Sequence, residues 1–233
     1  MSHRMEPTRR RMLHAGLAAV GLALASRPLP AWAAQLLRTP PQSRGPFYPL
    51  ELPLERDNDL VTVAGGSGPA KGEIANVVGR VLDDNGRPVR QARVEIWQCD
   101  ANGKYRHPWD RRQVPLDPNF QGYGQVVTGP DGGYRFRTIK PVPYPGRAAH
   151  IHFAISGPGF EPLITQLYVA GAPENAADFL LNGISDPQAR QRLVVVFERP
   201  AGSAELLARF DIVLAGDGRF GRRSPEYEQL RRG

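Results

Sequence analysis

The chain has 233 residues, a formal net charge of +7, a sequence pI near 10.0 and one cysteine, Cys99. One cysteine excludes an intrachain disulfide, and a chain of this length can bury a substantial core within one domain. Residues 1–33 hold five arginines and one glutamate and so supply +4 of the +7. The remainder is near +3, and a nucleic-acid partner is therefore not expected.

Residues 1–33 have the pattern of an export signal. Arg4 and the three arginines at 9–11 precede an uncharged apolar run at 15–25, and the small-residue sequence Ala-Trp-Ala follows at 31–33. An apolar run of this length is too short to span a bilayer, which takes about 20 residues. The paired arginines predict a twin-arginine route to the periplasm or the exterior, and no stable membrane span after cleavage. The alternative is a basic arm without structure.

The rest of the chain divides into three parts. Residues 34–75 are rich in proline and glycine and predict an irregular arm, residues 76–217 predict an all-β sandwich, and residues 218–233 predict a polar tail. Two short helices are expected as insertions, at 173–182 and 185–192, the second with Asp186 as its N-cap. About eight strands are expected, at residues 75–82, 92–98, 123–128, 134–139, 149–155, 163–171, 192–199 and 209–216.

The strand at 149–155 carries two histidines at alternate positions. The period of two puts Ile151 and Phe153 on the face toward the core and His150 and His152 on the opposite face. Two imidazoles about 7 Å apart on one rigid strand can converge on one metal ion. A pair of this kind also occurs by chance on exposed strands, so it does not decide the question alone.

Two tyrosines are candidate partners of the histidines. Tyr144 stands between two prolines that stiffen its backbone, and Tyr105 follows the end of a strand and a polar turn. A phenol has a pKa near 10, so only a strongly Lewis-acidic ion such as Fe(III) would keep two phenols ionised at neutral pH. Cys99 is interpreted as a lone buried thiol. The alternatives are a zinc or ferrous site with a carboxylate or third histidine, and a binding module without catalysis.

Several segments resemble the intradiol ring-cleavage dioxygenases, and within them the iron-binding (beta) chain of protocatechuate 3,4-dioxygenase. The similarity runs from about Gly45 to Gly216. It implies a β-sandwich that holds one non-haem Fe(III) through two tyrosines and two histidines. It also implies a catecholic substrate that O2 opens to a cis,cis-muconic acid. The segments are "VEIWQCDANGKYRH", "PLDPNFQGYG", "GGYRFRTIKPVPYP", "AHIHF" and "LITQLYVAG".

The resemblance assigns roles residue by residue. Arg147 matches the active-site arginine that stabilises developing negative charge, and Gln166 matches a glutamine close to the iron. Tyr144 is the tyrosine expected to leave the iron and act as a base. An exposed ion pair for Arg147 and a strand-edge contact for Gln166 are the alternatives. The implied iron ligands are Tyr105, Tyr144, His150 and His152, with water or hydroxide in the fifth place.

The sequence departs from the family pattern between Tyr144 and His150. Only the five residues "PGRAA" intervene, whereas family members have a longer loop that helps to wall the substrate pocket. The sequence therefore does not decide whether the substrate is protocatechuate, catechol, hydroxyquinol or a larger aromatic. Tyr48 is expected either near the site entrance or packed where the arm meets the domain, and Trp97 and His107 are expected to pack around the site. A homo-oligomer or a related second chain is expected as a partner.

Overall fold

The computed structural model describes residues 35–157, residue 160 and residues 162–215. The predicted export signal and the polar tail at 218–233 lie outside the described residues. No helix within the described part of the chain has the length and the apolar character needed to cross a membrane.

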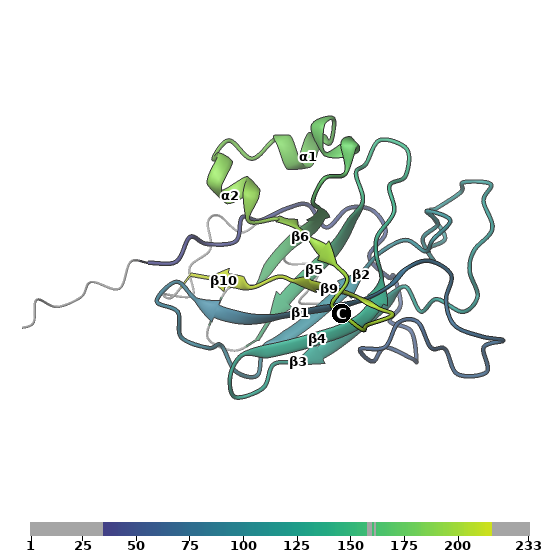
Figure 1. Ribbon diagram of the computed structural model, residues 1–233, viewed down its shortest axis with the longest axis horizontal. Helices are drawn as coiled ribbons and strands as arrows, with labels where there is room; N and C mark the ends of the chain where they lie inside the picture. Colours follow the sequence, from purple (N-terminus) through teal and green to yellow (C-terminus); the bar gives the residue numbers. More distant parts are fainter. Residues whose placement is uncertain (1–34, 158–159, 161, 216–233) are drawn as a thin grey trace, which may run out of the picture. The chain divides into compact units, whose positions relative to one another are not determined.

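Two five-stranded sheets form the domain (Figure 1). In the first sheet β1 is central, pairing with β4 antiparallel and with β9 and β10 in parallel, while β8 pairs with β9. Its strands are β1 (Ile74–Asp83), β4 (Gly133–Ile139), β8 (Phe197–Glu198), β9 (Leu206–Arg209) and β10 (Ile212–Leu214). The second sheet has the order β3-β2-β5-β6-β7, formed by β2 (Arg93–Trp97), β3 (Tyr123–Val127), β5 (His150–Ser156), β6 (Leu163–Val169) and β7 (Val194–Val195).

The prediction of an all-β sandwich is confirmed, with differences near the end of the chain. The strand expected at 192–199 is divided into β7 and β8, which pair in different sheets. The apolar run that predicted one strand therefore serves both sheets, with the exposed Val196 between them. Strand β9 was not expected, because "LLAR" is only four residues long.

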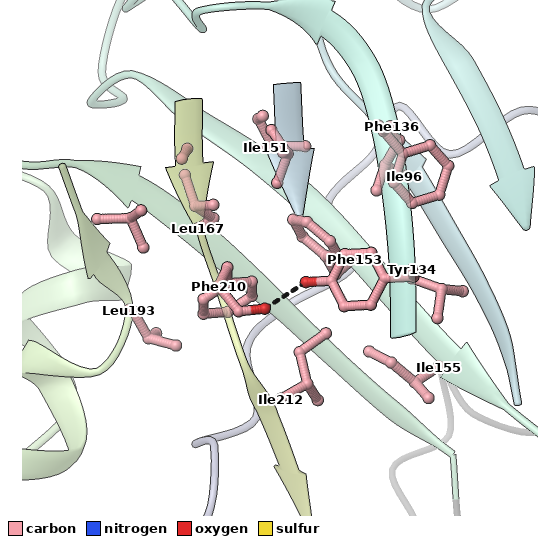
Figure 2. Close-up of a cluster of buried hydrophobic side chains, with 14 of the residues drawn as sticks. Ile96, Tyr134, Phe136, Ile151, Phe153, Ile155, Leu167, Leu193, Phe210 and Ile212 are labelled. Atoms are coloured by element: carbon pink, nitrogen blue, oxygen red, sulfur yellow. Dashed lines mark hydrogen bonds between the residues drawn. The ribbon is translucent and has the colours of Figure 1, made fainter. Parts of the chain in front are cut away.

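The core lies between the inward faces of the two sheets (Figure 2). Ile151 and Phe153 of β5 are fully buried there, as the period of two predicted. The ring of Phe153 packs edge-on against Phe210 with centroids 5.1 Å apart, and the hydroxyl of Tyr134 donates a hydrogen bond to the Phe210 carbonyl. Each fully buried side chain of this size contributes roughly 1.5–3 kcal/mol to the stability of the fold. The burial of Ile151 and Phe153 therefore fixes which face of β5 points into the core.

Three short helical segments follow β6: the 3-10 turn η1 (Pro173–Ala176), α1 (Phe179–Asn182) and α2 (Pro187–Gln191). Asp178 caps α1 by accepting hydrogen bonds from the backbone N–H groups of Leu180 and Leu181. Asp186 caps α2 and accepts from Gln188, as its position before a proline predicted. Figure 1 places α1 and α2 beyond one end of β6, close to the start of β5.

The arm lies along both sheets and bonds to their backbones. Thr39 donates to Val213 of β10, and Gln42 donates to Ile164 of β6. Farther along, the Leu60 N–H donates to Arg137 of β4. The residues between these points pass over the outer face of the second sheet, which is the face that carries the two histidines.

Candidate metal centre

One row of side chains crosses the outer face of the second sheet. His152 of β5 pairs with Trp97 of β2 on one side and with Gln166 of β6 on the other. His150 pairs with Tyr168 one step along the same face. Residues in register on neighbouring strands point to the same face, so the sheet itself brings these five side chains together. All five are fully buried or nearly so.

The two imidazoles converge. The Nε2 atoms of His150 and His152 lie 3.1 Å apart. The Nδ1 of His150 lies 2.6 Å from the carbonyl oxygen of Ala148, and an N–H that donates there leaves the Nε2 lone pair facing His152. Trp97 stacks on the His152 ring with centroids 4.8 Å apart and an interplanar angle of 5°. The rings are held in place, and their Nε2 atoms share one small volume.

Tyr105 reaches this volume from the loop that follows β2. Its hydroxyl lies 3.4 Å from the Nε2 of His150, and its side chain is buried. The ring of Phe47, from the arm, stacks on it with centroids 4.6 Å apart. The ring of Tyr144 meets it edge-on at 5.7 Å and lies 5.5 Å from the ring of His150. The four predicted ligands are thus adjacent, although Tyr105 lies about forty residues before the other three in the chain.

A tight turn orients Tyr144 and Arg147. The Arg147 N–H donates to the Tyr144 carbonyl at 2.9 Å, and Gly146 has a φ of +82°. Proline at the second position and a glycine with positive φ at the third are the requirements of a type II turn, and "YPGR" supplies both at Pro145 and Gly146. The turn explains how a loop of five residues can connect Tyr144 to β5.

The electrostatics of the site favour neutral donors in the absence of a cation. Burial, followed by the charge of Arg147, lowers the pKa of His150 to about 3. Burial also lowers the pKa of His152 well below its usual range and raises that of Tyr105 well above it. Burial raises the pKa of Tyr144, although Arg147 opposes the shift. The site therefore offers two neutral imidazoles with free lone pairs and two protonated phenols, which would ionise only on binding a Lewis acid.

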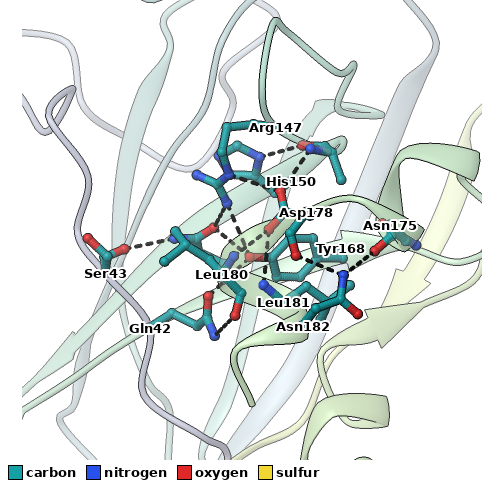
Figure 3. Close-up of polar contacts among 12 residues, drawn as sticks. Gln42, Ser43, Arg147, His150, Tyr168, Asn175, Asp178, Leu180, Leu181 and Asn182 are labelled. Atoms are coloured by element: carbon teal, nitrogen blue, oxygen red, sulfur yellow. Dashed lines mark hydrogen bonds and ion pairs between the residues drawn. The ribbon is translucent and has the colours of Figure 1, made fainter. Parts of the chain in front are cut away.

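Arg147 is held by three partners (Figure 3). Its Nε donates to Asp178 at 2.9 Å, and its Nη2 donates to the Oε1 of Gln166 at 2.6 Å and to the hydroxyl of Tyr168 at 3.1 Å. The amide of Gln166 in turn donates to the carbonyl of Ser43 in the arm at 2.7 Å. Arg147 and Gln166 are therefore neighbours in one buried arrangement, next to the His150–Tyr168 pair.

Reasoning from the sequence missed Asp178. Its carboxylate also accepts the Ala148 N–H at 2.9 Å, so one side chain joins the turn to the start of α1. The signal available in the sequence was an aspartate before "FLLN", which is an N-cap pattern, but nothing local pointed toward Arg147. Tyr168 was also missed, although it lies two residues after Gln166 on the same strand and must share its face.

The arm aromatics pack over the site. Tyr48 meets Trp97 edge-on at 4.9 Å, and its hydroxyl donates to the buried carboxylate of Glu95 at 2.9 Å. His107 lies against Phe47 with ring centroids 5.8 Å apart. Tyr48 and Phe47 therefore cover the row of site residues from outside and limit the access of water to it.

The thiol and carboxylate chemistry of a zinc site is missing among the described residues. No group of three or more His, Cys, Asp or Glu side chains that could hold a metal ion occurs in that part of the chain. Burial, followed by the charge of Asp100, raises the pKa of Cys99 to about 12, and its thiol donates to the carbonyl of Val142. Cys99 is thus a buried neutral thiol.

Comparison with known proteins decides the family. The protein-family model described as "Dioxygenase" matches residues 44–216. The chain belongs to this family. It is 43% identical over 170 residues to the protocatechuate 3,4-dioxygenase beta chain of Burkholderia cepacia, in a match that covers 69% of this chain and 72% of the relative. It is 35% identical over 201 residues to the hydroxyquinol 1,2-dioxygenase of Nocardioides simplex, covering 73% of this chain and 62% of that enzyme.

A solved structure of another dioxygenase has a similar fold to this chain. The dioxygenase domain of a dioxygenase–carbohydrate-binding protein fusion from Streptomyces sp. SirexAA-E is 31% identical, with a TM-score of 0.60. The match covers 76% of this chain and 98% of that domain. The relatives are ring-cleaving dioxygenases, and the predicted enzyme class is confirmed.

Proposed function

We propose that this chain is a non-haem Fe(III) intradiol dioxygenase that opens the ring of a catechol with O2 to a cis,cis-muconate-type dicarboxylic acid. The observation that carries the proposal is the convergence of four donors on one face of a sheet. The Nε2 atoms of His150 and His152 are 3.1 Å apart, the Tyr105 hydroxyl is 3.4 Å from the first, and the Tyr144 ring adjoins both Tyr105 and His150.

The donor set fits a ferric ion. Neutral imidazoles are lone-pair donors, and phenols whose pKa is raised by burial ionise only beside a strong Lewis acid. A hard trivalent ion suits phenolate oxygen better than zinc, which prefers thiolate, imidazole and carboxylate. Tyr105, Tyr144, His150 and His152 would hold Fe(III), with water or hydroxide in the remaining place. When bound, the ion supplies the Lewis acidity that ionises the phenols and withdraws electron density from the catechol ring.

Side chains of the protein would accept the proton, stabilise the developing charge and exclude water. Tyr144 is partly exposed while Tyr105 is buried, so the Tyr144 oxygen is the one placed to accept a proton from a catechol hydroxyl. The guanidinium of Arg147 would stabilise negative charge that develops on the opening ring. Gln166 and Tyr168 hold that guanidinium in position, and Phe47 excludes water above Tyr105.

A visible absorption spectrum tests the proposal. We expect iron-loaded protein to show a broad tyrosinate-to-Fe(III) band in the blue-green region that moves to longer wavelength when catechol is added without oxygen. Admission of O2 should then yield one equivalent of ring-opened diacid. Tyr105→Phe and Tyr144→Phe should each weaken or shift the band. A protein that stays colourless after ferric loading would refute the tyrosinate ligands.

Two further parts of the proposal concern the whole protein. We propose that residues 1–33 direct export, by the twin-arginine route, to the periplasm or the exterior. We also propose that the enzyme works as a homo-oligomer or with a related second chain, since one relative is named as the beta chain of its enzyme. Light scattering on the iron-loaded sample would measure its mass, and a monomer at working concentrations would refute the second part.

A further inference from the structure

A pocket of about 470 Å³ opens beside the turn that carries Tyr144 and Arg147. It lies between this turn and the segment from η1 to the start of α1. Because Tyr144 and Arg147 belong both to the pocket wall and to the candidate metal centre, a ring held at the centre can extend a substituent into the pocket. The lining residues are those at 143–148 together with Glu174, Ala177 and Asp178.

Most of the pocket wall is apolar. Pro143, Pro145, Ala148 and Ala177 contribute carbon surface, and glycine at 146 leaves space on the turn. Just beyond the wall stands Phe179, whose side chain is 67% exposed. The Arg147 guanidinium lies 5.7 Å from the centroid of this ring. An exposed aromatic ring beside an apolar hollow favours an uncharged, carbon-rich substituent.

The charges of the pocket disfavour an anion. Arg147 is its one cationic lining residue, and Asp178 neutralises it through an ion pair of 2.9 Å in which the two side chains are only 9% and 0% exposed. The Nη2 of Arg147 is engaged by Gln166 and Tyr168. Glu174 adds a second carboxylate, and no ion pair of Glu174 occurs among the described residues. The formal charge of the lining is therefore −1.

We infer that this pocket receives the ring substituent of the catechol, and that Glu174 selects against substituents that carry a negative charge. The inference rests on the proposed function and restricts the class of catechols that the enzyme would accept. The preferred substrate is a catechol with a neutral, apolar or aromatic substituent, and a catechol carboxylate is a poor one. Glu174 acts as a specificity-determining residue that faces the substituent, away from the bonds that break.

The test compares two substrates of similar size, 4-methylcatechol and 3,4-dihydroxybenzoate, with wild type, Glu174→Gln and Glu174→Lys. The ratio of kcat/KM for the carboxylate to that for the methyl compound should rise in this order, by roughly tenfold from wild type to Glu174→Lys, since a partly screened carboxylate is replaced by a cation. Glu198→Lys makes the same charge change on β8, an exposed position in the other sheet, and should leave the ratio unchanged.

The outcomes separate this inference from the proposed function. If both catechols are cleaved but Glu174→Lys leaves the ratio as in wild type, or if Glu198→Lys raises it equally, the inference is overturned while the function stands. A wild-type enzyme that prefers the carboxylate also overturns it. If iron-loaded protein neither binds nor cleaves any catechol, the proposed function fails and the inference fails with it. Spectral titration of catechol binding by each variant distinguishes a damaged centre from altered selectivity.

Discussion

Asp178 shows how one buried carboxylate can organise the candidate metal centre without being one of its predicted ligands. Its two oxygens accept hydrogen bonds from Arg147 and from three backbone N–H groups, those of Ala148, Leu180 and Leu181. Burial tends to raise the pKa of this carboxyl, but these backbone donors and the charge of Arg147 lower it below its usual value. Asp178 therefore stays ionised and fixes the guanidinium beside the site.

Asp178→Asn should destabilise the protein by about 3 kcal/mol at pH 7, because it breaks a buried ion pair and leaves Arg147 uncompensated. Since the folded pKa of Asp178 is lowered, its stabilisation is present above the unfolded pKa, near 3.9, and is lost as pH falls through the folded value. The difference in unfolding free energy between wild type and variant should therefore shrink in acid. Urea denaturation at pH 7 and at pH 3 measures both quantities.

The control is Asp186→Asn, which changes the same residue type at the exposed N-cap of α2. Asparagine caps about as well as aspartate, so this variant should lose well under 1 kcal/mol. Equal losses from the two variants would show that capping alone, rather than the contact with Arg147, accounts for the role of Asp178.

Among the elements, the arm is the part whose importance to the site was least expected. It binds β6 through Gln42, gives its Ser43 carbonyl to Gln166 and lays Phe47 over Tyr105. Gly45 lies between Ser43 and Phe47 and has a φ of +69°. A Cβ added to it would lie 3.2 Å from the Cε1 of His152. The arm therefore packs against the histidine ring so closely that a glycine is needed at this position.

Gly45→Ala should both strain the arm and push the His152 ring away from His150. We expect weaker iron retention and a diminished visible band, together with a loss of stability larger than the approximately 1 kcal/mol that a left-handed conformation costs an alanine. Gly65→Ala is the matched control, because Gly65 has a φ of +73° and nothing within 4 Å of an added Cβ. Should Gly45→Ala keep the iron content and spectrum of Gly65→Ala, the contact between arm and histidine would have no functional role.

At the scale of the whole molecule, the charge divides unevenly along the chain. Residues 1–33 account for +4 of the formal +7, and the remaining chain carries about +3 before its histidines are counted. The stretch matched by the dioxygenase family model runs from residue 44 to residue 216 and does not include residues 1–33. The basic segment thus lies outside the family match, and its pattern is the basis of the proposed export.

If residues 1–33 are an export signal, the protein recovered from the periplasm or medium of an expressing bacterium should lack them. Intact-mass measurement should find a chain that begins near residue 34, and replacing the arginines at 9–11 by lysine should hold the full-length chain in the cytoplasm. A control with Arg4→Lys alone should still be exported. Recovery of the uncleaved chain outside the cytoplasm would contradict this proposal.

The sequence by itself determined the features that depend on neighbouring residues. The period of two placed Ile151 and Phe153 in the core and His150 and His152 on the other face of one strand, and the aspartate before Pro187 marked the start of a helix. The family motifs pointed to the dioxygenases. These inferences succeed because alternation, capping and turn geometry act over a few residues.

Only the tertiary structure decided which distant groups meet. Nothing near Arg147 in the sequence indicates that Asp178, more than thirty residues away, neutralises it, or that the Ser43 carbonyl meets Gln166. The division of one apolar run into β7 and β8 likewise depends on two sheets competing for it. Such contacts form because packing the two sheets and the arm brings polar groups into burial, where each must find a partner, and that requirement acts across space rather than along the chain.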